Sequence, residues 1–253
     1  MAAANRVLLV ACVLVLIAPL CASAQGRGAA SAPDITGSWE RYGRGGARGD
    51  PSTVPPPAPQ PPLKPQYLKE WQAKQQAARD ADAKGKPLAT NATLCLPEGM
   101  PGMMGATFPM EILQSRGQVT VIEEAFTQVR RIFLDQPQKA LDDLEPGFYG
   151  HSVGRWEGDT LVVDTIGVKE DVRYQNIPHS PQMRIKERLR FVTPDVLWNE
   201  ITIEDSVTLE KPWTYTVAYR RMASYKLLEY ICEDNREFAD ANGVQQIRIG
   251  PAR

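Results

Sequence analysis

The chain has two histidines, and each stands directly before a serine: His151 before Ser152, and His179 before Ser180. Imidazole gains and loses a proton near neutral pH and therefore serves as a general acid or base. Paired with a carboxylate such as Glu187, it could drive a dehydration, an isomerisation or a hydrolysis without a cofactor. His179, Glu187 and His151 are therefore the candidate catalytic residues.

Other catalytic patterns are weaker. In the sequence GHSVG at 150–154 the histidine stands where a nucleophile elbow needs a different order, and no helix follows it, so a Ser-His-Asp triad is poorly supported. No HExxH or CxxC spacing indicates zinc, and the glycine-rich segment 43–49 lacks the GxxxxGK[ST] pattern of a phosphate loop. The sequence thus indicates no metal site and no cofactor.

A second group of candidates comes from the alternation of side chains along predicted strands. In Met183–Val192 the acid Glu187 shares one face with apolar residues only, and Glu123 and Glu229 hold the same position in their own rows. A carboxylate inside a protein needs a partner or water, so these rows predict a cavity with polar positions. The predicted lining residues are Trp213, Tyr215, Tyr219, Glu229 and Glu123.

Two alternatives remain open for these glutamates. Each could pair with an arginine and merely stabilise the fold, and Arg188, Arg190, Arg220 and Arg221 are numerous enough to serve. A β-bulge could also reverse the faces and place every glutamate outside.

The elements that must position these side chains are strands. From Met110 onward the hydrophobic period is two, and short turns such as Glu157–Asp159 separate the strands, with Gly158 suited to a positive φ. No helix in this region is long enough for a crossover, so we predict a mainly β protein: an antiparallel meander that closes into a barrel or curls strongly. The predicted strands are Gln118–Glu124, Val129–Asp135, Thr160–Ile166, Met183–Val192, Val196–Glu204, Trp213–Met222 and Lys226–Cys232.

The first 24 residues have the pattern of a signal peptide. Arg6 precedes the apolar run Val7–Leu20, and Ala22–Ala24 supplies the small residues before a cleavage site. The run is too short for a membrane anchor, which needs about 20 apolar residues. We predict a periplasmic or secreted protein without a transmembrane segment in its mature form. Lipidation at Cys21 is a minor alternative, because the peptidase that processes lipoproteins does not favour a leucine such as Leu20 directly before the cysteine.

Export changes the interpretation of the cysteines. Cys12 and Cys21 leave with the signal peptide, so Cys95 and Cys232 remain. One pair in an oxidising compartment indicates a disulfide that ties the start of the folded body to its end. The rival interpretation, a catalytic thiol, needs an activating neighbour and a reducing environment.

The mature chain divides by composition. Residues 25–40 form a first strand region, 41–65 a Gly/Pro-rich extended arm, 66–87 an amphipathic helix with Tyr67, Leu68 and Trp71 on one face, and 88–253 the β body. We expect the arm to wrap over the surface as a linker; its alternative role is to dock a partner.

Gly37-Ser38-Trp39 opens the first strand. A Gly-x-Trp at this place resembles the lipocalin and calycin barrels, in which the tryptophan plugs the closed end. Trp39 as an ordinary core tryptophan is the simpler interpretation.

A wider resemblance covers roughly residues 34–236. The long motif GHSVGRWEGDTLVV at 150–163, with CLPEG at 95–99 and EYIC at 229–232, resembles a family of secreted bacterial proteins that has no established activity. The chain departs from that family in two loops. Gln136–Gln138 stands where relatives carry Gly-Arg and then His, and Val172–Tyr174 stands where they carry Thr-Trp, so a shared ligand could differ here.

Composition leaves a wide choice of function. A net charge of -1 excludes a strongly basic nucleic-acid surface. The preferred hypothesis is an exported binding protein that holds a small apolar or aromatic molecule in a β-barrel, with His179 near the mouth. The alternatives are a cofactor-independent enzyme that uses a His–Glu pair in the same cavity, and an envelope docking protein that acts through the arm.

Overall fold

The computed structural model describes residues 32–43, 50–91, 93–105, 108–232, 237–239, 241–243 and 245–247. The predicted signal peptide and the segment 44–49 lie outside these residues. The chain divides into two units, 1–31 and 32–253, and the described residues all belong to the second unit.

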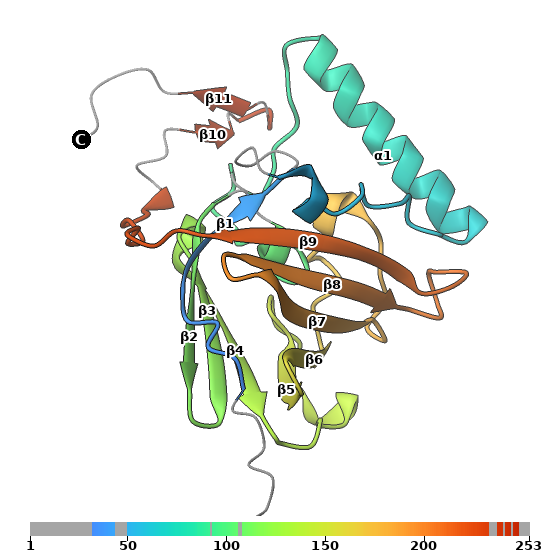
Figure 1. The fold of residues 1–253 in the computed structure, drawn as a ribbon. Helices are drawn as coiled ribbons and strands as arrows, with labels where there is room; N and C mark the ends of the chain where they lie inside the picture. The colour runs from blue at the N-terminus through green and yellow to red at the C-terminus, as the bar shows by residue number, and fades with distance from the viewer. Residues whose placement is uncertain are drawn as a thin grey trace, which may run out of the picture. The chain divides into compact units, whose positions relative to one another are not determined.

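Nine strands close into a barrel, which confirms the prediction of a mainly β protein (Figure 1). A separate pair of short strands, β10 and β11, follows near the C-terminus. The barrel strands are β1 (Gly37–Tyr42), β2 (Met110–Ser115), β3 (Gln118–Glu123), β4 (Gln128–Leu134), β5 (His151–Glu157), β6 (Thr160–Ile166), β7 (Arg184–Thr193), β8 (Val196–Glu204) and β9 (Trp213–Arg221), and the two short strands are β10 (Glu237–Ala239) and β11 (Gln245–Ile247).

One strand pairing in the barrel is parallel. β4 and β5 run in the same direction, with Ile132 opposite Ser152, whereas all other barrel neighbours are antiparallel. The prediction of a purely antiparallel meander is wrong at this point. The segment 135–150, which contains a short 3-10 helix at Leu141–Asp143, carries the chain from the end of β4 back to the start of β5.

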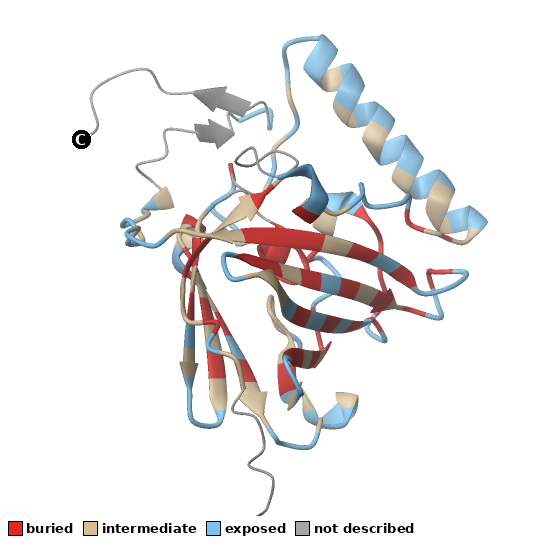
Figure 2. Cartoon of the chain, in the orientation of Figure 1, coloured by how far each residue is buried: buried red, intermediate tan, exposed pale blue. Residues whose placement is uncertain are grey.

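Burial alternates along the strands as their patterns predict (Figure 2). Ile185, Glu187 and Leu189 of β7 are buried and their neighbours are exposed. One predicted strand is wrong: Lys226–Cys232 has no strand structure. Its Leu228 and Ile231 are exposed, and the backbone N–H of Leu228 donates to Glu124 instead of to a strand.

The predicted helix is α1 (Pro65–Ala83), inserted between β1 and β2. Pro65 begins it, where the missing N–H costs nothing. None of its side chains is buried, and it contacts the barrel unit along the half-buried Tyr67, Leu68 and Trp71. The other helical pieces are 3-10 turns, namely η1 (Pro51–Thr53), η2 (Gly102–Gly105), η3 (Ala125–Thr127), η4 (Leu141–Asp143) and η5 (Tyr174–Asn176).

The proline-rich arm lies on the barrel over the residues that the structure describes. The indole N–H of Trp198 donates to the Thr53 carbonyl at 2.7 Å, and that of Trp213 donates to the Pro59 carbonyl at 2.9 Å. Leu63 is buried and bridges to Leu209. The described part of this segment is thus held to the barrel at Thr53, Pro59 and Leu63.

Trp39 is fully buried in the core. Its indole N–H donates to the Ile35 carbonyl at 3.1 Å, and the Arg221 guanidinium lies 4.3 Å from the ring centroid. Phe191 packs beside it with ring centroids 6.0 Å apart. This cluster fills the barrel near the end where β7 and β9 finish.

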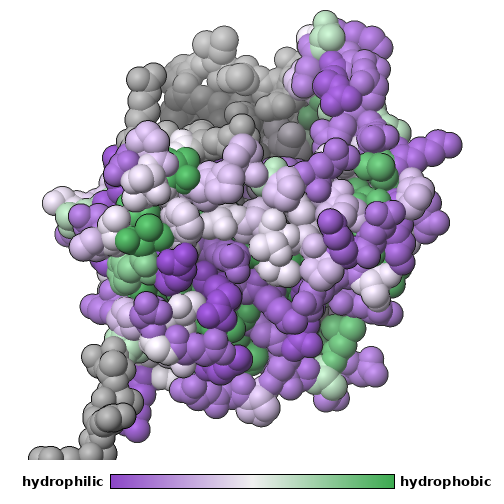
Figure 3. Space-filling view, turned by 45° about the vertical axis from the view of Figure 1, so that its right-hand side comes forward, coloured by the Kyte–Doolittle hydropathy of each residue, from purple (hydrophilic) through white to green (hydrophobic). Residues whose placement is uncertain are grey.

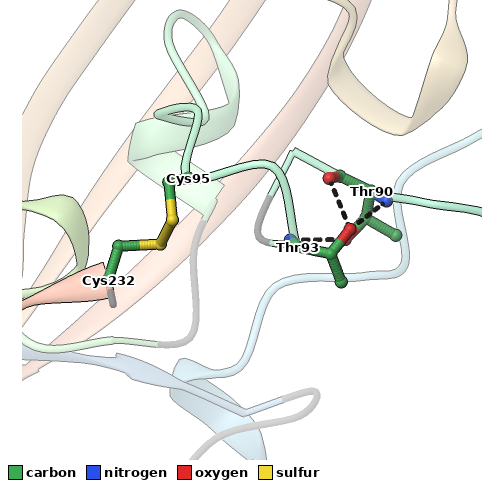
Figure 4. The surroundings of a disulfide bond; sticks show 4 residues. All are labelled: Thr90, Thr93, Cys95 and Cys232. Carbon is green, nitrogen blue, oxygen red and sulfur yellow. Dashed lines mark hydrogen bonds between the residues drawn. A yellow bond between two sulfur atoms is a disulfide. The ribbon is translucent and has the colours of Figure 1, made fainter. Parts of the chain in front are cut away.

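Cys95 and Cys232 form the predicted disulfide (Figure 4). The bond ties the segment after β9 to the loop that precedes η2. That loop is braced locally by Thr90 and Thr93, whose side chains and backbones bond to each other. No helix in the described part of the chain is long and apolar enough to cross a membrane.

Candidate functional site

A belt of polar side chains runs through the barrel interior, one from each of five consecutive strands. Arg130 of β4 donates from two nitrogens to the carboxylate of Glu187 on β7, with the Nη1–Oε1 bond at 3.1 Å. Its remaining hydrogen bonds reach Ser152 of β5 and Thr165 of β6. Asn199 of β8 donates to Glu187 at 2.8 Å.

This belt is sealed from solvent. Arg130 is 1% exposed and Glu187 is 0% exposed. A buried ion pair is tolerated only where its remaining donors and acceptors are satisfied, and the hydroxyls of Ser152 and Thr165 do this for the guanidinium. The predicted inward placement of Glu187 is confirmed, but its partners are Arg130 and Asn199, and no histidine bonds to it.

The aromatic row predicted on β9 also faces inward. Trp213, Tyr215 and Tyr219 are buried, and the Trp213 and Tyr215 rings lie 4.7 Å apart. The Tyr219 hydroxyl donates to the Met104 carbonyl at 2.5 Å. Burial, followed by the proximity of neighbouring tyrosines and of Glu187, raises the pKa of Tyr215 well above its usual range, so this phenol stays neutral.

A small apolar cavity of about 20 Å³ lies at the barrel end where β7 and β9 begin. Tyr174 of η5, with its ring 6.4 Å from that of Tyr215 and stacked on it, forms one wall, and Trp213 forms another. A space of this size holds about one water. The other lining residues are Pro101, Val172, Ile177, Pro178, His179, Met183, Ile203, Asp205, Thr208 and Leu209.

His179 lies in the wall of this cavity. Its Nε2 is 2.9 Å from the Val172 carbonyl oxygen, and its Nδ1 is 3.0 Å from the Ser180 carbonyl oxygen. A neutral imidazole has one N–H donor and so satisfies one of these carbonyls at a time. Each nitrogen therefore lies against a backbone carbonyl oxygen. A proton-transfer pair would require a carboxylate there, and neither nitrogen is hydrogen-bonded to one among the described residues.

A larger groove of about 350 Å³ lies outside the cavity and shares part of its wall. Pro178, His179 and Thr208 line both spaces, so they separate the groove from the apolar interior. Tyr67 and Glu70 of α1 form the opposite side of the groove. His179 therefore lies at a boundary between the inside and the outside of the barrel.

Asp205 fixes the chain next to His179. It accepts hydrogen bonds from the Ser180 N–H at 2.6 Å and the Ser180 hydroxyl at 2.9 Å. Burial opposes ionisation of Asp205, but these bonds and those from 207–208 lower its pKa below the usual value. The Thr208 hydroxyl is buried without a hydrogen bond of standard geometry, close enough to Asp205 to favour its charge. Ser180 is thus bound as a structural donor.

Glu123 occupies a different polar position at the same barrel end. It is 1% exposed; its Oε2 accepts from Gln128, and its Oε1 has no partner among the described residues. Burial, with the nearby Glu98, raises the pKa of Glu123 to about 9, so its carboxyl is neutral at pH 7. Burial also raises the pKa of Glu98. Gln128 links Glu123 to the loop that carries Glu98 by accepting from the Gly99 N–H.

His151 belongs to neither group. Its ring stacks on Phe133, and its Nδ1 is 2.9 Å from the Gln138 side-chain oxygen. Burial and the nearby Lys139 lower its pKa, so the ring is uncharged at neutral pH.

Glu229 is the clearest error among the predicted ligand-binding residues. It is exposed on the irregular segment after β9, so the row of Leu227, Glu229 and Ile231 does not face a cavity. The alternation was inferred for a strand that does not form. The structure thus brings Trp213 and His179 to one cavity, with Tyr215 buried against the Trp213 ring behind its wall. It places Glu187, Tyr219 and Glu123 inside the barrel with other partners, and it leaves His151 and Glu229 apart.

Sequence reasoning missed three residues of this region: Arg130, Tyr174 and Glu98. The sequence does not identify Arg130 as a buried residue. Gln128 and Arg130, which face inward, are as polar as Arg131, which faces outward, so polarity does not distinguish the two faces of β4. Tyr174 lies in a loop outside the predicted strands, so no alternation of side chains assigns it to the cavity wall.

Among the described residues, no group of three or more histidine, cysteine, aspartate or glutamate side chains is placed to hold a metal ion. No family model matches this chain, and no curated protein matches it.

Proposed function

We propose that this protein is an exported binding protein that holds a small apolar or aromatic molecule at the end of its barrel. The ligand would contact Trp213, Tyr215 and Tyr174, with His179 at the mouth. The observation that carries the proposal is the apolar cavity lined by Trp213 and Tyr174, whose rings both pack on the ring of Tyr215.

The geometry also supports a route of entry. A cavity of about 20 Å³ is too small for an aromatic ligand, so its wall must move on binding. The wall shared with the outer groove is the segment of Pro178 and His179, which is held by hydrogen bonds from His179 and from Ser180. In our proposal this segment opens and the ligand enters from the groove.

Export is supported by two features of the chain. The N-terminal pattern is that of a signal peptide, and the Cys95–Cys232 disulfide is typical of oxidising compartments. The resemblance of the GHSVGRWEGDTLVV motif to secreted bacterial proteins, and of Gly-Ser-Trp to lipocalins, agrees with this location and with a ligand-holding barrel.

The test is to identify what the native protein carries. Native mass spectrometry of protein from its own host should find a small molecule bound to the wild type. The Ile177→Trp variant, in which the larger side chain fills the cavity, should no longer bind the molecule. The control is Tyr225→Phe, on the segment after β9 and outside the cavity lining, which should still bind it. Thermal denaturation checks that both variants fold.

A probe titration covers the case of a ligand lost in purification. Indole and decanol, added to the wild type, should shift the NMR signal of the Trp213 indole N–H. An empty cavity in several preparations, together with an unchanged Trp213 signal, would refute the proposal.

A further inference from the structure

A second groove, of about 470 Å³, lies between α1 and η5, apart from the barrel cavity. Its lining is unusual in composition, because it contains one indole, four side-chain amides and one guanidinium, and neither a carboxylate nor an aliphatic side chain. The lining residues are Trp71, Gln72, Gln75, Arg79, Gln175 and Asn176.

The groove is held in shape by one backbone oxygen. The indole N–H of Trp71 donates to the Gln175 carbonyl at 3.1 Å, and the side-chain amide of Gln75 donates to the same oxygen at 3.0 Å. The helix and the loop are thus fixed to each other at the floor of the groove. An ion pair between Glu70, the residue before Trp71 on α1, and Arg173, at 3.1 Å, gives a second link between the helix and the loop.

Several polar groups in the groove remain available. No hydrogen bond to another described residue takes up the side-chain amides of Gln72 or Asn176. Arg79 binds Gln76 through Nε and Nη2, which leaves its Nη1 without a partner in the described structure. Gln175 and Asn176 both have positive φ, 52° and 61°, a strained conformation for non-glycine residues that presents their side chains from an exposed loop.

This chemistry favours one class of ligand. Amides both donate and accept, so they match the paired donors and acceptors of vicinal hydroxyl groups, and an indole offers an apolar face with a fixed position. Figure 3 shows the helix in this region as a largely hydrophilic surface, unlike a face that docks an apolar partner. The groove has one arginine in its lining and the chain has a net charge of -1, so the site lacks the positive charge that binds a nucleic acid.

We propose that the groove between α1 and η5 is a saccharide-binding site, in which Trp71 packs against a sugar ring and the amides of Gln72 and Asn176 bind its hydroxyl groups. Arg79 lies at one end of the groove, one helical turn beyond Gln75, and would contact an acidic substituent. The site is separate from the barrel cavity and does not depend on a ligand there.

The experiment is an NMR titration of the full mature protein with three probes: cellotriose, chitotriose and tri-galacturonate. The Trp71→Phe variant assigns the Trp71 indole N–H signal. A saccharide should shift this signal and the amide signals of Gln72 and Asn176. If Arg79 contributes as proposed, Arg79→Gln should weaken the acidic trimer more than the two neutral ones.

Two substitutions test the amides with little risk to folding. Gln72→Ala is on an exposed helical position, and Asn176→Gly relieves the positive φ; each should weaken binding about three- to tenfold, the value of one lost hydrogen bond. Gln66→Ala, an exposed glutamine of the same helix outside the groove, should leave affinity unchanged.

The outcomes separate clearly. If none of the trimers shifts the Trp71 signal at millimolar concentration, or if binding survives both Gln72→Ala and Asn176→Gly at full affinity, the saccharide site is refuted. Thermal melting of each variant shows whether a loss of binding reflects a loss of fold. Binding in the barrel cavity reports through Trp213, so the two proposals succeed or fail separately.

Discussion

At the scale of single residues, the two buried glutamates Glu187 and Glu123 differ in their charge and in their partners. Glu187 is ion-paired with Arg130, and its charge is balanced. Glu123 has only the Gln128 amide, and one of its oxygens has no partner among the described residues. Burial without a cation favours the neutral acid. Glu123 is therefore a neutral acid held inside the barrel that accepts from Gln128, whereas Glu187 is an ionised member of a network that links β4 to β8.

This difference predicts how stability depends on pH. The pKa of Glu123 is about 9 in the folded protein and near 4.5 in the unfolded chain, so the folded state binds more protons between these values. The free energy of unfolding must then fall as pH rises through this window. Glu123→Gln, an uncharged mimic, should remove that slope and stabilise the protein at pH 7 by up to about 3 kcal/mol.

Urea denaturation of both proteins at pH 5 and pH 8 measures this effect. The wild type should lose more stability between the two pH values than the variant does. Parallel losses would show that Glu123 is ionised in the folded protein.

Single residues also show where sequence reasoning stops. Alternation correctly placed Glu187 and Glu123 on inward rows, because apolar neighbours at i±2 define the face. It could not identify Arg130 as the partner, since Gln128 and Arg130 face inward on β4 while the more apolar Val129 and Phe133 are only partly buried. Arg130 meets Glu187 only because the closed barrel brings β4 opposite β7, and the sequence does not show which positions of two distant strands face each other.

At the scale of elements, two glycines of the long motif have different tasks. Gly150 and Gly158 have nearly equal positive φ, 62° and 63°. A Cβ on Gly158, in the turn between β5 and β6, would meet nothing within 4 Å. A Cβ on Gly150 would lie 2.4 Å from the Ile166 carbonyl oxygen, so the backbone of β6 requires a glycine there.

The pair makes a matched test. Gly158→Ala should lower the free energy of unfolding by about 1 kcal/mol, because alanine is strained in the left-handed conformation. Gly150→Ala adds a clash with backbone and should cost more than about 3 kcal/mol. Chemical denaturation of the two variants gives both values, and equal costs would contradict the close packing of Gly150 against β6.

Element boundaries were predictable where the information is local. Thr160–Ile166 and Val196–Glu204 match the predicted strands in full. The segment Lys226–Cys232 has the same alternation, but it lies after β9, which already pairs with β1 to close the barrel. With no free strand edge to receive it, this segment is instead held by Glu124 and by the disulfide.

At the scale of the whole molecule, the disulfide joins the segment after β9 to the loop before η2. The residues it connects are 137 positions apart. In the chain-entropy account, closing a loop of this length restricts the unfolded chain and contributes about 5 kcal/mol.

Removing the bond should therefore weaken the whole barrel. Cys95→Ser with Cys232→Ser should lower the free energy of unfolding by about 4–5 kcal/mol, and the variant should no longer respond to a reducing agent. Urea denaturation with and without reductant checks both points. A wild type whose stability is unaffected by reduction would show that the bond constrains only the local segment.

The parallel pairing of β4 with β5 has a consequence for how the chain folds. It divides the barrel into two runs of hairpins, β2–β4 and β5–β9, each of which can form from nearby residues. The pairings of β1 with β2 and with β9 instead join segments that lie far apart in the chain, as in Trp39 with Met110 and with Arg221, and these carry the larger loop-closure cost. Barrel closure should therefore be the slow step of folding, and the amides of β1 should be the last to gain protection when hydrogen exchange is followed during refolding.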